Sequence, residues 1–155
     1  MNHQWIFWIA LAAYALHVME EFFYDWKNWA NHVLKLEVDW PGFYVTNSAV
    51  LFLGIACASA GWQIPCFSLM FPSLMLINAF FFHLLPTIVK RKFSPGLITA
   101  LVLFIPIGLY NFQLASENGV NTKEIVGAFF GGILLMAYPI VLLKTKNHRL
   151  FNQKI

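Results

Sequence analysis

The chain has 155 residues, of which 59% are hydrophobic and only 11% are charged. Soluble domains carry about 25% charged residues, so this composition excludes an ordinary soluble domain. The net charge of +3 comes from basic residues that stand beside apolar segments, and no base-reading motif accompanies them. We therefore expect no nucleic-acid partner, and we interpret the basic residues as signals of membrane orientation.

Five apolar segments follow one another along the chain, at residues 4–25, 43–62, 65–89, 96–115 and 125–143. Each is close to the length of about 20 residues that a helix needs to cross a hydrocarbon core of about 30 Å. The sequence therefore predicts an all-α fold, an integral membrane helical bundle with about five transmembrane helices. We expect residues 1–155 to form a single transmembrane domain.

The first span is predicted to be a membrane helix and not a cleaved signal peptide. No Lys or Arg precedes it, and its apolar pattern runs past the small-residue site at Ala15. Residues 26–42, which come next, mix Trp, Lys and acidic side chains, as an amphipathic segment at the membrane surface does. Gln63 and Ile64 alone separate the second and third spans, which predicts a tight antiparallel hairpin.

Prolines and glycines mark the later spans. Pro86 lacks an N–H, so it frees the carbonyl of Phe82 and is expected to kink the third span. Pro106 lies in the middle of the fourth span, and Gly131 and Gly132 lie in the fifth. We interpret these as kink and close-packing positions, which neighbouring helices make tolerable inside a membrane.

Basic residues gather after the third and fifth spans: Lys90, Arg91, Lys92, Lys144, Lys146 and Arg149. In a bundle of five spans these two ends lie on one side of the membrane, and the positive-inside rule makes that side cytoplasmic. We therefore expect a protein of the cytoplasmic (inner) cell membrane, with its amino terminus outside and its carboxyl terminus in the cytoplasm.

Two adjacent acids, Glu20 and Glu21, are the charged residues that lie well within an apolar span. A charge near the centre of a membrane costs at least about 2.5 kcal/mol on insertion scales, so such a residue usually faces the bundle interior with a partner, a proton or a metal. At 100° per residue, Glu21 lies about 40° from His17 and Glu20 about 60° from it on the other side. The three side chains therefore share one face.

Polar residues of the other spans fall at a similar depth on the cytoplasmic half: Asn47, His83, Thr99 and Tyr138. Asn78 lies deeper, and in a regular helix it would be about 140° from His83, too far to share its face. The sequence therefore predicts a polar layer to which all five helices contribute.

We interpret this layer as a metal site. His17, Glu20 or Glu21, and His83 would be the metal ligands, with Asn47 or Asn78 in support. Two histidines and a carboxylate suit Zn, and equally Fe(II) or Mn. The second glutamate would be the catalytic acid or base, so both Glu20 and Glu21 are candidate catalytic residues. In the alternative interpretation the same groups form buried salt bridges that fix helix packing.

Several known membrane metalloenzyme patterns are excluded. The chain has no HExxH zinc-protease helix and lacks the histidine boxes of membrane desaturases. It lacks the third histidine of ceramidase-type hydrolases. The EExxxR pattern of prenyl-protein endopeptidases fails because "FFYD" follows the two glutamates.

The residues "HVMEE", "NAFFFH" and "KFSPGLITALVLFIPIGLY" together resemble the HXXEE-motif family of small bacterial and archaeal membrane proteins. The resemblance implies a multi-pass protein but no settled activity. It also implies a set of site positions: His17, Glu20, Glu21, Asn78 and His83, followed by Ser94, Pro95, Gly96 and Thr99. Ser94 has a structural interpretation as well, because serine can cap the start of the fourth helix.

Our first functional hypothesis is a metal-dependent membrane enzyme, with hydrolysis favoured over oxidation. Its substrate would be lipid-like or otherwise apolar, and its partners would be membrane lipids. The second hypothesis is a small proton-coupled carrier in which the glutamate pair and His83 relay protons. A third is a non-catalytic membrane protein with a structural His/Glu network.

Overall fold

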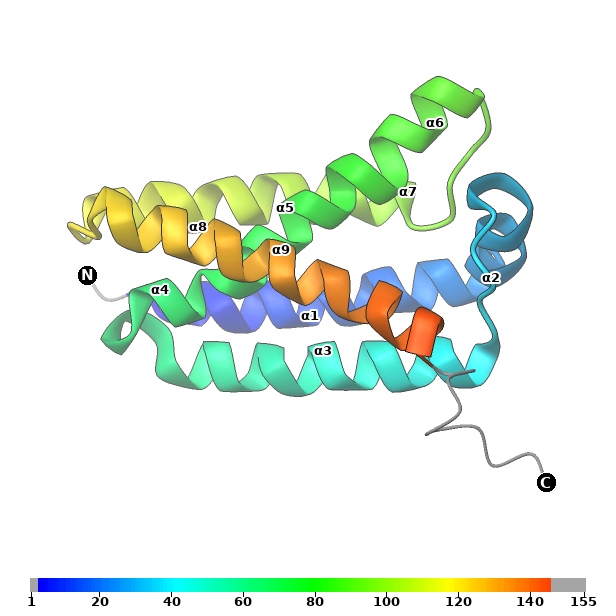
Figure 1. Ribbon diagram of the computed structural model, residues 1–155. Coiled ribbons are helices and arrows are strands. Elements are labelled where there is room, and N and C mark those ends of the chain that lie inside the picture. Colours follow the sequence, from blue (N-terminus) through cyan, green and yellow to red (C-terminus); the bar gives the residue numbers. More distant parts are fainter. Residues whose placement is uncertain (1–2, 146–155) are drawn as a thin grey trace.

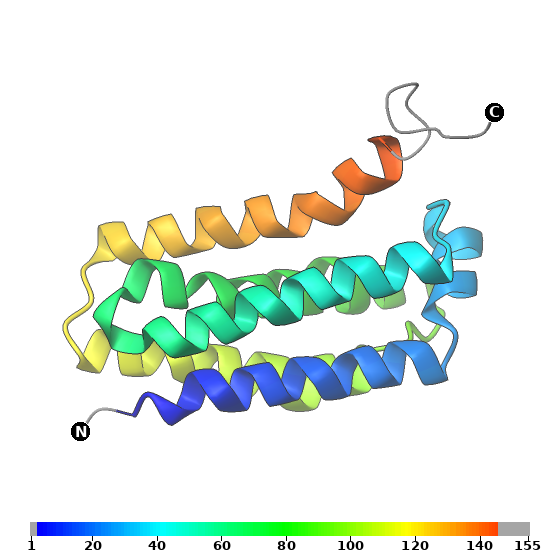
Figure 2. The same ribbon diagram turned by 90° about the horizontal axis from the view of Figure 1, so that it is seen from below.

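The computed structural model describes residues 3–145, and these residues form helices and turns with no strand (Figure 1). Five helices are long and apolar enough to cross a membrane: Trp5–Phe23, Trp40–Gln63, Pro65–Lys90, Leu97–Glu117 and Thr122–Thr145. They run alternately in opposite directions (Figures 1 and 2). The prediction of an all-α membrane-type bundle with five spans is confirmed. Of the predicted basic residues, Lys146 and Arg149 lie outside the described residues.

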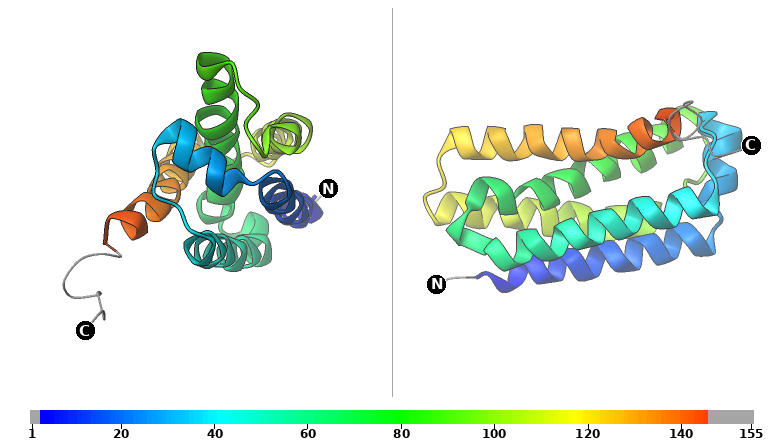
Figure 3. Two further views of the ribbon diagram at one scale, coloured as in Figure 1. Left: turned by 90° about the vertical axis from the view of Figure 1, so that its right-hand side faces the viewer. Right: turned by 60° about the horizontal axis from the view of Figure 1, so that its bottom comes forward.

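The segment between the first two spans lies across one end of the bundle, here called the α2 end (Figure 3, left). It contains α2 (Trp26–Trp29) and the short π-helix η1 (Ala30–Leu34). Asp25 separates α2 from α1 (Trp5–Phe23), because its backbone is left-handed with φ +56°. This is the segment for which the sequence predicts an amphipathic position at the membrane surface.

The helix α3 (Trp40–Ala60) begins three residues earlier than the sequence predicts. The carboxylate of Asp39 accepts a hydrogen bond of 2.7 Å from the amide of Gly42, and proline occupies the first turn. An N-cap acid followed by proline is a strong start signal for a helix. The cap therefore extends the helix beyond the apolar run, through the aromatic residues at its start.

The third span is the central helix of the bundle. It consists of α4 (Pro65–Ser68), α5 (Met70–Asn78), the π-helix η3 (Ala79–Leu84) and α6 (Leu85–Lys90). In the most apolar 18-residue stretch of this span, 56% is buried inside the protein. The corresponding share is 17% for the peripheral helix α9 (Thr122–Thr145). The third span is therefore the natural place for buried polar residues.

Glycines allow α9 to pack closely on α5. A Cβ atom added at Gly131 would lie 2.6 Å from Cε of Met70, and one at Gly132 would lie 2.7 Å from Cβ of Ser73. These distances are far below van der Waals contact. The sequence-based interpretation of this pair as close-packing residues agrees with the structure.

Two π-helices interrupt the spans, each just before a proline. η3 is followed by Leu85 and Pro86, and η4 (Ala100–Phe104) is followed by Ile105 and Pro106. The amides of Leu85 and Ile105 reach back five residues, to Phe80 and Ala100. Because proline has no N–H and its ring clashes with the carbonyl four residues earlier, the helix widens by one residue ahead of it.

The fourth span contains α7 (Leu97–Thr99), η4 and α8 (Ile105–Glu117). In both the third and the fourth span the widened turn lies at the half of the bundle nearer the α2 end (Figure 1). The angle between Asn78 and His83 predicted for a regular helix does not apply across η3, because a π-helix advances by a smaller angle per residue. The sequence analysis did not anticipate this change of register.

Candidate metal centre

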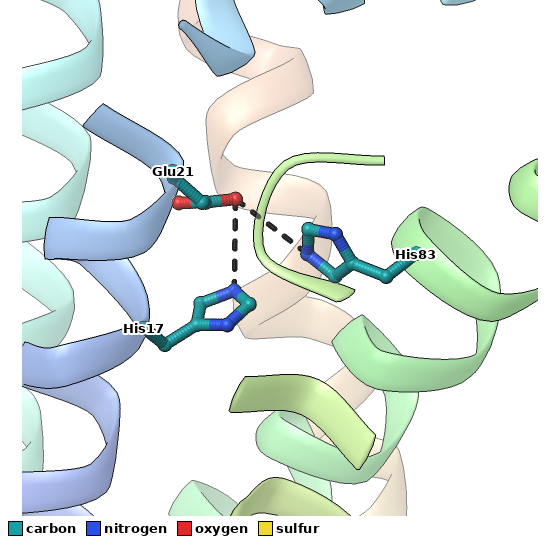
Figure 4. Close-up of side chains that lie close together, drawn as sticks. All are labelled: His17, Glu21 and His83. Atoms are coloured by element: carbon teal, nitrogen blue, oxygen red, sulfur yellow. Dashed lines mark ion pairs between the residues drawn. The ribbon is translucent and has the colours of Figure 1, made fainter. Parts of the chain in front are cut away.

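Three buried side chains converge in the half of the bundle near the α2 end: His17 and Glu21 of α1, and His83 of η3 (Figure 4). Oε1 of Glu21 lies 3.6 Å from Nε2 of His17 and 3.5 Å from Nε2 of His83. Their side chains are 7%, 1% and 0% exposed, respectively. All three ligand atoms lie within 4.8 Å of one another, so the group could hold a metal ion. We call these three residues the His/Glu cluster.

The far side of the His17 ring is fixed by a relay of hydrogen bonds. Nδ1 of His17 lies 2.8 Å from Oγ1 of Thr99, and the Thr99 hydroxyl donates to Oε2 of Glu20 over 2.6 Å. A hydroxyl has a single proton, so Oγ1 must accept the hydrogen bond from the imidazole. This assigns the proton of neutral His17 to Nδ1, and its Nε2 keeps a free lone pair.

The far side of the His83 ring follows the same rule. Nδ1 of His83 lies 3.0 Å from Oγ of Ser94, and this hydroxyl donates to the backbone carbonyl of Phe82 over 3.3 Å. That carbonyl is the one that Pro86 leaves without its usual helical partner, as the sequence indicates. The Ser94 hydroxyl therefore accepts from Nδ1–H, and Nε2 of neutral His83 also keeps a free lone pair.

The cluster therefore consists of acceptors that face one another. Among the described residues, Nε2 of His17 and Nε2 of His83 are buried nitrogens with no hydrogen-bond partner. A carboxylate oxygen and two imidazole lone pairs repel each other unless a positive charge lies between them. A proton on one of the rings or a bound cation would supply that charge.

Glu20 points away from the cluster and anchors the start of the fourth span. Its carboxylate accepts hydrogen bonds from the amides of Gly96 and Ile98, both 3.1 Å, and of Thr99, 2.7 Å. A negative charge is favourable at this position, since the first amides of a helix have no helical partner. The sequence predicts Glu20 as a ligand or catalytic acid or base, and in the structure its carboxylate bonds to the first amides of another helix.

The turn at residues 94–96 covers the cluster. Gly96 has φ +95°, and an added Cβ would lie 2.6 Å from Cε1 of His83, 2.8 Å from Cε1 of His17 and 3.0 Å from Cγ of Glu21. Only glycine fits this backbone conformation and this close approach. Ser94 does not cap the fourth helix, because its hydroxyl lies between His83 and the Phe82 carbonyl.

Aromatic rings complete the wall of the cluster. The ring of Phe104 lies 4.2 Å from that of His17, centroid to centroid, and stacks on Tyr14 at 5.9 Å. The hydroxyl of Tyr14 donates to Oδ1 of Asn47 over 2.7 Å. The sequence analysis missed Phe104, because a phenylalanine in an apolar span has no polar signal that marks it.

A cavity of about 530 Å³ adjoins the cluster, and Glu21 belongs to the walls of both. The cavity lies between α1, α3, the third span and α9, and its walls are mainly apolar. Its polar lining includes Tyr14, Asn47 and Asn78. Asn78 is buried, and its Oδ1 makes no hydrogen bond within the described residues.

All the predicted site residues except Tyr138 therefore fall into three groups. His17, Glu21 and His83 form the cluster, and Ser94, Thr99 and Glu20 bond to its histidines or to each other. Asn47 and Asn78 line the cavity. Tyr138 is exposed on α9, and it is not one of the described residues that line this cavity.

The donor set of the cluster suits a divalent transition metal. Two imidazole nitrogens and one carboxylate are the ligands of catalytic zinc sites and of non-haem iron sites that keep positions open for water or substrate. Hydrogen bonds at the second nitrogen of each histidine fix the tautomer that a metal requires. The residues present therefore fit a metal ion chemically.

Comparison with known proteins identifies the sequence family. Residues 8–111 match a family model described as "Protein of unknown function with HXXEE motif". A stretch of 72 residues is 42% identical to "Uncharacterized protein YrkK" of Bacillus subtilis (strain 168) and covers 45% of this chain. The match spans 46% of that relative, less than half of its length. No solved structure matches the chain.

The motif of this family is His17, Glu20 and Glu21 in the sequence HVMEE. The matched range also contains His83 and the turn at residues 94–96, so it includes the whole cluster and the cover above it. Because the match extends over well more than half of the 155 residues, this chain belongs to the family of proteins with the HXXEE motif.

Proposed function

We propose that this protein is a metal-dependent integral membrane enzyme in which His17, Glu21 and His83 hold one divalent ion, Zn, Fe or Mn. The observation that carries the proposal is the meeting of two unpartnered imidazole nitrogens with one carboxylate oxygen in a buried pocket. A structural ion pair would need one histidine and one acid. Here two histidines face the same oxygen, and each is fixed from behind by a hydroxyl group.

The reaction that we favour is hydrolysis of a lipid-like or other apolar substrate. A divalent ion lowers the pKa of a bound water and polarises a carbonyl group. Glu21 also lines the cavity, and with Oε1 as the metal ligand its second oxygen, Oε2, is the candidate proton acceptor. The Asn78 amide, in the same cavity, offers a hydrogen-bond donor to an oxygen that gains negative charge.

Glu20 has a different part in this proposal. Its carboxylate accepts hydrogen bonds from three amides and one hydroxyl, all of them at the start of the fourth span. We assign it as a positioning residue that holds Thr99 against His17. The site would face the cytoplasmic side of the cell membrane, as the basic residues near the α2 end indicate.

The test is the metal content of the protein, purified in detergent through a tag without histidine. Elemental analysis should find about one zinc, iron or manganese per chain in the wild type, since the cluster offers a single set of ligands. His17→Ala, His83→Ala and Glu21→Gln should each lose most of it. His32→Ala is the matched control, because His32 lies on η1 and bonds to the carbonyl of Asn28.

Two results would overturn the proposal. One is wild-type protein without stoichiometric metal, also after incubation with each of the three ions. The other is equal metal content in the wild type and in the cluster variants. Proton flux in liposomes that disappears in Glu21→Gln, in protein without metal, would instead support a proton-coupled carrier.

A further inference from the structure

The cavity beside the cluster is elongated along the helices. Leu135 and Thr145 both line it and lie ten residues apart on α9, which corresponds to about 15 Å at 1.5 Å per residue. On the opposite wall, Pro41 and Val50 lie at the two ends of a similar length of α3. The cavity therefore runs parallel to the direction in which lipid chains lie.

The cavity opens toward the membrane between α3 and α9. Val45 of α3 and Ile140 of α9 line it and are also 58% and 38% exposed, so they form part of its rim. Toward the α2 end, α9 diverges from the third span, as Figure 1 shows. Both rim residues are apolar and lie within spans, so an apolar molecule can enter sideways from the bilayer.

Polar groups of the cavity follow one another along its length, starting at the α2 end. At the α2 end, Trp26 lines the cavity with an indole nitrogen that is buried and has no hydrogen-bond partner in the described chain. Glu21 and Asn78 lie farther in, and Asn78 has an unpartnered Oδ1 while only 8% of its surface is exposed. Beyond them Tyr14 and Asn47 are bonded to each other, and the other side chains that line this part are apolar, among them Val50, Leu74 and Leu135.

We infer that this cavity binds one long acyl chain of an ester or amide lipid, which enters between α3 and α9. The chain lies along α9 toward Leu135, the linkage lies beside Asn78 and Glu21 with the N–H of an amide linkage as the donor to Oδ1 of Asn78, and the head group lies at the α2 end near Trp26. An amphiphile fits this order of lining because each part of it meets groups of its own polarity. The inference rests on the proposed function in one respect, since Glu21 is placed at the linkage as a metal ligand.

The test uses palmitic acid with a diazirine at the end of its chain, photolysed with the purified wild-type protein and mapped by peptide mass spectrometry. Crosslinks are expected on the walls that α3 and α9 contribute to the cavity. Leu135→Trp fills the apolar end and should lower crosslinking there by about tenfold, the effect expected when a side chain occupies space that a ligand needs. Ile133→Trp is the matched control, because Ile133 is exposed on the same helix and does not line the cavity.

Val50→Phe provides a second test from the opposite helix if Leu135→Trp does not fold. Crosslinking equal to the wild type in both variants, or crosslinks confined to the exposed faces of the spans, would overturn the inference. His17→Ala separates it from the proposed function. Because His17 does not line the cavity, this variant should keep the crosslink while it loses metal.

Discussion

Glu20 and Glu21 are neighbours in the chain but serve different partners. The carboxylate of Glu21 faces two imidazole rings, and that of Glu20 faces the first amides of the fourth span. They can diverge because adjacent residues of a helix point about 100° apart. Thr99 connects the two acids, since its hydroxyl bonds to Glu20 and accepts from His17.

Removing the Thr99 hydroxyl should weaken metal binding. Thr99→Val keeps the volume of the side chain but leaves Nδ1–H of His17 without its acceptor. Loss of such a hydrogen bond behind a ligand typically lowers metal affinity by about 10- to 100-fold. Titration of the metal-free protein with buffered zinc would measure it. Thr99→Ser should bind as the wild type does, and equal affinity in Thr99→Val would show that the relay does not matter.

A side chain at position 96 should disturb the cluster directly. Gly96→Ala places a Cβ atom 2.6 Å from the His83 ring in a left-handed backbone. Gly119→Ala is a matched control, because Gly119 has φ +74° and no atom within 4 Å of the added Cβ. Both should lose about 1–2 kcal/mol to the left-handed conformation. Thermal unfolding and metal content should show a larger loss of stability, and a loss of metal, in Gly96→Ala alone.

The sequence could predict the three residues of the cluster but not how the acids divide between partners. Helical periodicity places His17, Glu20 and Glu21 on one face, and the depth of the spans brings His83 to their level. The assignment of Glu20 depends on the amides of residues 96–99, whose position is a tertiary contact. The need for glycine at position 96 depends equally on atoms of two other helices.

At the scale of elements, the widened turn η3 sets the position of His83. Pro86 causes the widening and leaves the Phe82 carbonyl for Ser94, which in turn accepts from His83. The kink next to a proline can be predicted from sequence. The π-helix and its change of register cannot, because hydropathy reports which residues are buried and not the number of residues in each turn.

Replacing this proline should affect stability and metal binding in opposite directions. Pro86→Ala restores an amide that can bond to Phe82 within a regular helix, so the unfolding temperature should rise. The same bond competes with Ser94 and rotates His83, so metal affinity should fall. Pro106→Ala is the control, because η4 contains no metal ligand. Unchanged metal affinity in Pro86→Ala would contradict the coupling.

At the scale of the whole molecule, hydropathy was sufficient to predict the five spans. Each span can be recognised from the length and hydropathy of its own residues, without reference to the rest of the chain. The cavity was beyond prediction. It exists because α9 packs on α5 through Gly131 and Gly132 and then diverges from the third span toward the α2 end (Figure 1). Such divergence depends on packing between helices far apart in sequence.

The proposed orientation can be checked with single cysteines at opposite ends of the bundle. In a chain with Cys57→Ala and Cys66→Ala, Asn118→Cys should react with a membrane-impermeant maleimide in intact cells. Lys92→Cys should react after permeabilisation only, since the positive-inside rule places the basic turn in the cytoplasm. Both native residues are exposed, so each cysteine is reachable from its own side. The reverse labelling pattern would show that the protein has the opposite orientation in the membrane.

The contact between Glu20 and the fourth span also constrains how the protein is made. The amides and the hydroxyl that bond to its carboxylate lie 76 to 79 positions later in the chain. When the ribosome has completed the first span, none of them has been synthesised. Its carboxylate therefore lacks these hydrogen bonds until the fourth span has been synthesised. Chains that end before residue 96 would keep an uncompensated carboxylate in their first helix.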